Sequence, residues 1–368
     1  MPSPTPLRAA LLVAAVLAHA EAAAAAFSSD VSGNTLTLIQ LSDGGDVEIT
    51  HHGAGEFGLS EGGGGMSLAG VAPNLVVQML DDSGSHLELE FLGALPGSVT
   101  LALGDGDRVV DFSGDTPQIG GDFEMRGGTG SQLSGVSASQ ALEVGGDLVL
   151  EGVNDFSSPS VPVEVGGDLR VTTRGETVES FVDLFYLDLE GDFVYQGGSD
   201  LDFVELGFGD VEIRGKVAID LGDGVSNGGK PYFQVVRLKS GMNGSPRVVR
   251  RMSVRGGDVG NPELVEIEPG AELVGGLRVA LGDGENQAIV SGSGGSFQYT
   301  GGADVDSVTL GVMAPGAKLK LGDGTDTLSL VAPLMLDKFS VDFGPGTDTY
   351  MIEAGTSEPA GAKLKNLP

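Results

Sequence analysis

The segment Lys318-Leu319-Lys320-Leu321-Gly322-Asp323-Gly324 joins an alternating stretch to a Leu-Gly-Asp-Gly motif. Side chains of a β-strand point alternately to its two faces, so the leucines share one face and the lysines the other. The apolar face ends on Leu321, directly before the glycine, which indicates a short half-buried strand that always turns at the same phase. The motif recurs with its first glycine at three other positions, and a Phe-Gly-Pro-Gly variant gives a fifth: Gly104, Gly222, Gly282 and Gly344.

The spacing of these motifs predicts a repeat. Their first glycines are separated by near multiples of roughly 20 residues, which is typical of solenoids. A second motif, Gly-Asp before a short apolar stretch, repeats every 21 to 25 residues at Asp122, Asp147, Asp168 and Asp192. That interval is too short for a strand-helix-strand unit of about 30 residues, but it fits one coil of three short strands and three turns. We therefore expect an all-β, right-handed parallel β-helix (β-solenoid) with coils of about 20–25 residues and with Gly and Asp at its corners.

The two interleaved motifs, over about residues 95 to 350, resemble those of secreted bacterial Gly-Asp-rich parallel β-helix repeat proteins. The resemblance implies the fold more than an activity, because that family is largely of unknown function. The segments Leu321 to Ser329 and Phe343 to Met351 also bear a distant similarity to hemolysin-type (RTX) calcium-binding repeats. Leu or Phe replaces the first glycine of that nonapeptide, and its tandem nine-residue spacing is missing.

Composition excludes several classes of protein. The chain has 52 acidic and 20 basic residues and a formal net charge of −32, so nucleic acid is not an expected partner. It contains no cysteine, which excludes disulfides, thiolate metal sites and cysteine catalysis. Glycine accounts for 62 of the 368 residues without a three-residue period, so collagen is excluded as well.

The N-terminus has the pattern of a secretory signal, which predicts a secreted, periplasmic or cell-surface protein. Residues 1–26 combine one arginine, an apolar stretch from Ala9 to Ala18 and small-residue cleavage sites between Ala20 and Ala26. We expect residues 27–95 to form an N-terminal cap and the first coils, because solenoids need atypical ends. Residues 96–368 are then the β-helix proper, and no membrane insertion is expected after the signal is removed.

A basic insert near residues 225–275 interrupts this pattern. Seven basic residues cluster there, and Arg247, Arg250 and Arg251 are candidate ligand-binding residues for an extracellular polysaccharide or another anionic cell-surface polymer. The alternative, somewhat favoured, is that these arginines neutralise neighbouring acidic coils and protect exposed strand edges.

The RTX-like segments raise the hypothesis of a weak calcium site. Asp326 and Asp348 are one coil apart, so their carboxylates would stack about 5 Å from each other and repel unless a cation or a proton intervened. Asp323, Asp326 and Asp348 are the candidate ligands. The alternative, which we favour, is that these aspartates form turns at exposed corners.

The sequence leaves three functions open. We favour an exported, non-catalytic protein for adhesion, matrix structure or polysaccharide contact through a repetitive face. A carbohydrate-active enzyme, either a polysaccharide lyase or a glycosidase, is the second, and its candidate carboxylates are Asp183, Asp188, Glu190 and Asp192. No catalytic set is assigned, because fold analogy alone does not establish activity. A calcium-stabilised structural repeat is the third.

Overall fold

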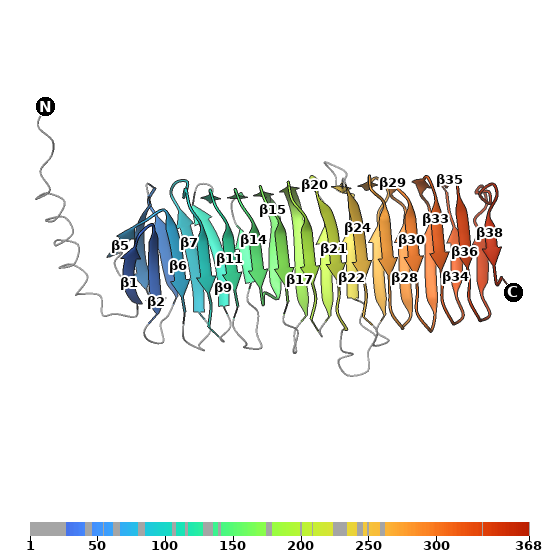
Figure 1. Ribbon diagram of the computed structural model, residues 1–368, viewed down its shortest axis with the longest axis horizontal. Coiled ribbons are helices and arrows are strands. Elements are labelled where there is room, and N and C mark those ends of the chain that lie inside the picture. The colour runs from blue at the N-terminus through green and yellow to red at the C-terminus, as the bar shows by residue number, and fades with distance from the viewer. Residues whose placement is uncertain are drawn as a thin grey trace, which may run out of the picture.

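The computed structural model describes residues 27–40, 46–53, 55–61, 67–79, 85–104, 108–114, 117–127, 135–138, 141–173, 179–198, 201–207, 209–223, 234–240, 246–248, 250–257, 262–332 and 334–367. Every regular element in these ranges is a β-strand. The strands wind into an elongated stack in which consecutive coils lie side by side from the N-terminus to the C-terminus (Figure 1). The predicted parallel β-solenoid is therefore confirmed.

One face of the stack is a 15-stranded sheet, which we call sheet 1. From β2 onward its strands are all parallel, and only β1 pairs antiparallel, with β2. In stacking order its strands are β1 (Phe27–Ser32), β2 (Thr35–Gln40), β6 (Asn74–Gln78), β8 (Val99–Ala102), β11 (Phe123–Arg126), β14 (Leu148–Glu151), β16 (Leu169–Thr172), β18 (Phe193–Gln196), β21 (Lys216–Asp220), β24 (Arg251–Arg255), β27 (Leu277–Ala280), β30 (Phe297–Thr300), β33 (Ala317–Lys320), β36 (Phe339–Asp342) and β38 (Lys363–Lys365).

The opposite side of each coil has two strand segments, so sheet 2 consists of two columns. Column 2a contains β3 (Val47–His51), β7 (Ser85–Phe91), β9 (Arg108–Gly114), β12 (Gly135–Ala138), β19 (Asp202–Leu206), β22 (Gln234–Leu238), β25 (Glu263–Ile267), β28 (Asn286–Val290), β31 (Asp306–Leu310), β34 (Thr327–Leu330) and β37 (Thr349–Ile352). Column 2b contains β10 (Gln118–Ile119), β13 (Leu142–Val144), β20 (Val211–Ile213), β23 (Arg247–Val248), β26 (Glu272–Leu273), β29 (Ser293–Gly294), β32 (Met313–Ala314) and β35 (Met335–Leu336). Two long strands, β15 (Asp155–Val165) and β17 (Ser180–Leu189), run through both columns.

Each coil therefore has two corners that border sheet 1. We call the connection from column 2b into sheet 1 the upper corner and the connection from sheet 1 into column 2a the lower corner, after their places in Figure 1. The Gly-Asp motifs lie at the upper corner, directly before strands such as β14. The Leu-Gly-Asp-Gly motifs lie at the lower corner, directly after strands such as β21.

The core follows the alternation seen in the sequence. Inward-facing side chains of sheet 1 and sheet 2 form one continuous apolar cluster, in which Leu319 and Leu321 are 1% and 0% exposed. Gly322 then turns the chain with φ of 106°, a left-handed conformation that favours glycine. The half-buried strand and the fixed phase of its turn are both confirmed.

Coil length varies in the way the motifs suggest. Phe123 aligns with Leu148, which gives a coil of 25 residues, and Phe297 aligns with Ala317, which gives one of 20. The coil from Val217 to Met252 is 35 residues long, and residues 224–233 and 241–245 within it lie outside the described ranges.

Antiparallel pairing among the described strands is confined to the N-terminal end. Besides β1 with β2, strand β4 (Glu56–Glu61) pairs antiparallel with both β3 and β5 (Ser67–Val71). These strands cover one end of the parallel stack, as a capping segment does. The expected boundary of the cap at residue 95 stays a prediction, and the expected signal in residues 1–26 lies outside the described residues.

The buried corner leucine gives the first prediction. Leu321→Ala removes a fully buried side chain, so the free energy of unfolding should fall by roughly 3 kcal/mol. Thr300→Ala is the control, since Thr300 is exposed and aligns with Ala280 on the preceding coil, and its effect should stay within about 0.5 kcal/mol. Chemical unfolding of the two variants measures both values. Equal effects would contradict the assigned inward face.

Candidate functional site

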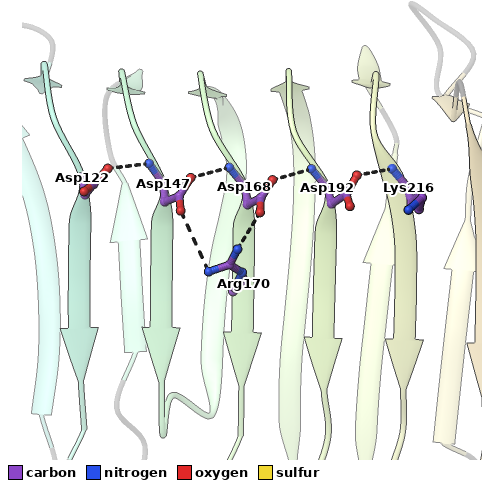
Figure 2. Close-up of polar contacts among 6 residues, drawn as sticks. All are labelled: Asp122, Asp147, Asp168, Arg170, Asp192 and Lys216. Carbon is purple, nitrogen blue, oxygen red and sulfur yellow. Dashed lines mark hydrogen bonds and ion pairs between the residues drawn. The ribbon is translucent and has the colours of Figure 1, made fainter.

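The upper corner of the N-terminal half carries a chain of side-chain to backbone hydrogen bonds (Figure 2). The backbone N–H of Asp147 donates to Oδ1 of Asp122 at 2.9 Å, and that of Asp168 donates to Oδ1 of Asp147 at 2.9 Å. The pattern continues through Asp192, whose N–H donates to Asp168 at 3.0 Å, to Lys216, whose N–H donates to Asp192 at 2.8 Å. Each aspartate thus satisfies a backbone donor on the next coil that the sheet leaves free.

This chain of bonds explains the glycines that precede each aspartate. A Cβ atom on Gly146 would collide with Oδ1 of Asp122, and one on Gly167 would collide with Oδ1 of Asp147. A side chain at either position would therefore displace the acceptor that the corner uses. The Gly-Asp motif is a structural requirement of the stacking.

The charge at this corner reverses at β21. Lys216 occupies the position that aspartate holds on the four preceding coils, and it aligns with Arg251 on the following coil. A lysine or arginine side chain offers no acceptor, so the chain of bonds ends there. The upper corner is consequently acidic in the N-terminal half and neutral or basic in the C-terminal half.

A groove of about 400 Å³ lies at the acidic part of the upper corner, and we call it the acidic groove. It is bordered by Leu95, Ile119 and Val144, whose side chains are buried in the core beneath it. Its wall is formed by outward side chains that align on successive coils: Gln118, Glu143, Glu164 and Asp188.

One arginine, shared by three carboxylates, offsets part of the negative charge at the end of the acidic groove. Nη1 of Arg214 lies 2.5 Å from Oδ1 of Asp188 and 2.7 Å from Oε1 of Glu190. Glu143 and Glu164 have no ion-pair partner among the described residues. Of the carboxylates that the sequence suggested for an enzyme, the structure brings Asp188 and Glu190 together at this groove. Asp183 lies apart from them, on the column 2a part of β17. Asp192 is used in the corner chain of hydrogen bonds.

A second groove, of about 540 Å³, lies at the upper corner near the C-terminal end. We call it the basic groove, because Lys318, Lys338 and Lys363 line it with Asp337 as the single carboxylate. Phe297 and Phe339 of the same strands also border it, but their rings point into the core and are 2% and 3% exposed. Sequence reasoning missed this site, because its three lysines come from different coils and belong to no motif.

The lower corner holds a column of buried polar side chains. Each begins or directly precedes a strand of column 2a and is in register with the next, and Asn286, Asp326 and Asp348 follow the glycine turn by two residues. The members, each at most 8% exposed, are Ser180, Asp202, Gln234, Glu263, Asn286, Asp306, Asp326 and Asp348.

The last three carboxyls of this column are linked through the backbone. Asp326 N–H donates to Oδ1 of Asp348 at 3.0 Å, and Asp306 N–H donates to Oδ1 of Asp326 at 2.9 Å. Burial raises the pKa of Asp306 to about 7, and the charges of Asp326 and Asp304 add to that shift. Burial also raises the pKa of Asp326, with the charges of Asp348 and Asp323 adding to it. A proton is therefore retained in the column at mildly acidic pH.

The three candidate calcium ligands lie as follows. Asp326 and Asp348 stack on successive coils as expected, but they are 0% and 8% exposed rather than at exposed corners. Asp323 is exposed on the preceding turn, where its backbone N–H donates to Gly302. Among the described residues, no three His, Cys, Asp or Glu side chains group closely enough to hold a metal ion. The calcium site stays a prediction.

The three candidate arginines of the basic insert are divided between the two sheets. Arg247 lies on β23 of sheet 2, where its Nε is 3.4 Å from Oε2 of Glu272. Arg250 is exposed on the connection between β23 and β24, and its backbone N–H donates to the carbonyl of Gly215 at 3.3 Å. Arg251 begins β24 of sheet 1 and is exposed. Their role in ligand binding stays a prediction, and Lys230 of the same insert lies outside the described residues.

We compared the chain with protein-family models, curated proteins and solved structures. No family model, curated protein or solved structure matches the chain. No helix in the described ranges has the length and apolar character to cross a membrane.

The corner chain of bonds gives a second prediction. Asp147→Ala leaves the N–H of Asp168 without its acceptor, so the free energy of unfolding should fall by about 1 kcal/mol. Asp147→Asn keeps an amide oxygen in the same place and should stay close to wild type. Thermal or chemical unfolding of the two variants compares them, and equal losses would show that the hydrogen bond is not what stabilises the corner.

The buried column gives a third prediction, on pH dependence. Asp306 has a folded-state pKa of about 7, above its ordinary value of 3.8, so the folded protein binds more protons between these limits. The contribution of Asp306 to the free energy of unfolding is therefore largest below about pH 4. As pH rises from about 4 to about 7, that contribution falls by up to about 1.4 kcal/mol per pH unit.

Asp306→Asn isolates that contribution, because Asn286 already occupies the aligned position on the preceding coil. The stability difference between wild type and the variant, measured by unfolding from pH 4 to pH 8, should increase in favour of the variant as pH rises. A difference that does not change with pH would contradict a protonated Asp306.

Proposed function

We propose that the protein is an exported, non-catalytic rod that contacts extracellular polysaccharide or another cell-surface polymer through its repetitive lateral faces. One observation carries the proposal: outward-facing positions align in register along the stack, one per coil. Thr100, Glu124 and Val149 align on three successive coils, and the same column continues through Arg170 and Val194.

The physical argument is multivalency. Aligned side chains on neighbouring parallel strands are about 4.8 Å apart, so a linear polymer lying along the stack meets one equivalent position per coil. Several weak contacts held at fixed spacing give an avidity that no single contact supplies. A continuous apolar core holds the coils in place, which limits the entropy lost on binding.

We also propose that the chain is a secreted member of the Gly-Asp-rich β-helix repeat proteins that its motifs resemble. Two features support this. Within the described residues, the Leu-Gly-Asp-Gly and Gly-Asp motifs lie at two distinct corners of the coil. Residues 1–26 have the composition of a secretory signal. Adhesion and matrix structure are the roles that such a rod would serve.

Retention on polysaccharide tests the function. The exported chain is incubated with a panel of insoluble extracellular polysaccharides, with and without calcium, and the bound fraction is measured. We expect retention on at least one polymer with no soluble sugar released. Absence of retention on every polymer would contradict the proposal.

A carbohydrate-active enzyme is the second candidate, and the acidic groove is the observation that favours it. Glu143 and Glu164 are aligned, unpaired carboxylates on adjacent coils about 4.8 Å apart, which is close to the carboxyl separation of about 5–5.5 Å in retaining glycosidases. The same incubations decide between the two. Soluble oligosaccharides that disappear in Glu143→Gln and Glu164→Gln would replace the non-catalytic function with an enzymatic one.

A further inference from the structure

The cations of sheet 1 have different surroundings in the two halves of the stack. In the N-terminal half, the guanidinium group of Arg126 pairs with Glu124 and Glu151, and that of Arg170 lies 2.6 Å from Asp168. Their charges are compensated locally, and this part of the sheet presents no net attraction for an anion.

From β24 onward the compensation is missing. The only carboxylate on these strands is Asp342, which already pairs with Nζ of Lys365 at 2.8 Å. The other cations of these strands are exposed and have no ion-pair partner within the described residues: Arg251, Arg255, Arg278, Lys318, Lys320 and Lys363. We call this surface the basic strip. An uncompensated cluster of cations is unusual on a chain with a net charge of −32, and it indicates an anionic partner.

The strip is long and narrow. Arg278, Gln298, Lys318, Ser340 and Lys363 align on five successive coils in one column. A second column, two residues further along each strand and about 7 Å away, includes Arg255 and Lys320, and Arg251 lies about 7 Å from the first column on its other side. From β24 to β38 the strip spans five coil intervals, or about 24 Å.

The basic groove forms one side of the strip. Lys318 and Lys363 belong to both, and Lys338 adds a third ammonium group at the corner. The Gln298 amide and the Ser340 hydroxyl line the same groove and can hydrogen-bond a neutral polar group. A groove with three cations and neutral polar groups fits a chain that bears both carboxylates and hydroxyls.

We propose that the basic groove and strip bind one extended chain of an acidic, carboxylate-bearing polysaccharide that lies along the stack. The inference rests on the proposed function and names its polymer class. One extended chain fits along these columns, and exposed acids such as Asp323 and Asp337 border the strip and would repel the dense phosphates of duplex DNA. The charged groups supply affinity, and the groove side chains recognise sugar hydroxyls.

Direct binding tests this with a fluorescent polyuronate oligosaccharide long enough to span about 24 Å. Its methyl ester is the matched probe, because esterification removes the negative charges and keeps the sugar. We expect the acid form to bind at least about tenfold more tightly than the ester, and its affinity to fall steeply as salt rises from about 50 to about 200 mM. Equal affinities for acid and ester would overturn the inference.

The groove variant replaces each lysine with a residue already present in its own column on a nearby coil. Lys318→Gln copies Gln298, Lys338→Ser copies Ser296, and Lys363→Ser copies Ser340, so the fold is expected to tolerate all three. We expect this triple variant to lose at least about tenfold in affinity, since each lost charged hydrogen bond alone has an effect of that order.

A control variant of equal charge change separates local contacts from net charge. Arg126→Ala, Arg237→Gln and Lys239→Gln remove three cations that have carboxylate partners elsewhere on the stack. It should bind the acid oligosaccharide within about twofold of wild type, because the screening length at physiological salt is about 8 Å. Equal losses in the groove and control variants would overturn the assigned site.

A further measurement needs no variant. Lysine acylation of the wild-type protein, mapped by mass spectrometry, should show that the polyuronate protects Lys318, Lys338 and Lys363 and leaves Lys216 reactive. Protection elsewhere, or tighter binding of duplex DNA or of anionic lipid vesicles, would overturn the inference. Retention on neutral polysaccharides without polyuronate binding would also overturn it, but would leave the proposed function in place.

Discussion

In-register stacking of parallel strands is the constraint on which the rest of the structure depends. Each coil completes its backbone hydrogen bonds only through the coils above and below it, so residues at equivalent positions must align for the whole length of the stack. The buried corner side chains Leu221, Leu321 and Phe343 hold that alignment from inside. Asp122 and Asp147 hold it at the surface by accepting backbone N–H groups of the next coil.

Because the coils are in register, residues at equivalent positions form columns along the stack, and the residue types in a column set the charge of that part of the surface. The same corner position is aspartate on the coils of Asp168 and Asp192 and basic at Lys216 and Arg251, so one residue type per coil decides the sign of an entire edge. At the lower corner, carboxyls such as Asp306 and Asp326 stack away from water. Burial disfavours their charged forms, so their pKa values rise. We therefore regard the acidic and basic edges and the buried column as three consequences of one architecture.

The fold could be predicted because its signals are local. Alternation around Leu319 and Leu321 gave the buried face, and the spacing of Asp147 and Asp168 gave the coil length. The basic groove could not be predicted, since Lys318, Lys338 and Lys363 meet only when coils of unequal length are in register. The burial of Asp326 could not be predicted either. An aspartate that follows a glycine turn is expected at the surface, and only the structure shows that this turn directs its side chain inward.

Unbroken register across the longest insert is the most direct test of this account. Spin labels attached to cysteines introduced at Thr100 and Gln298, in a chain without native cysteine, lie in one column separated by eight coil intervals. Electron–electron resonance should give a single distance near about 38 Å, which is eight intervals of about 4.8 Å. A broad distribution, or a distance well below that value, would contradict the continuous stack.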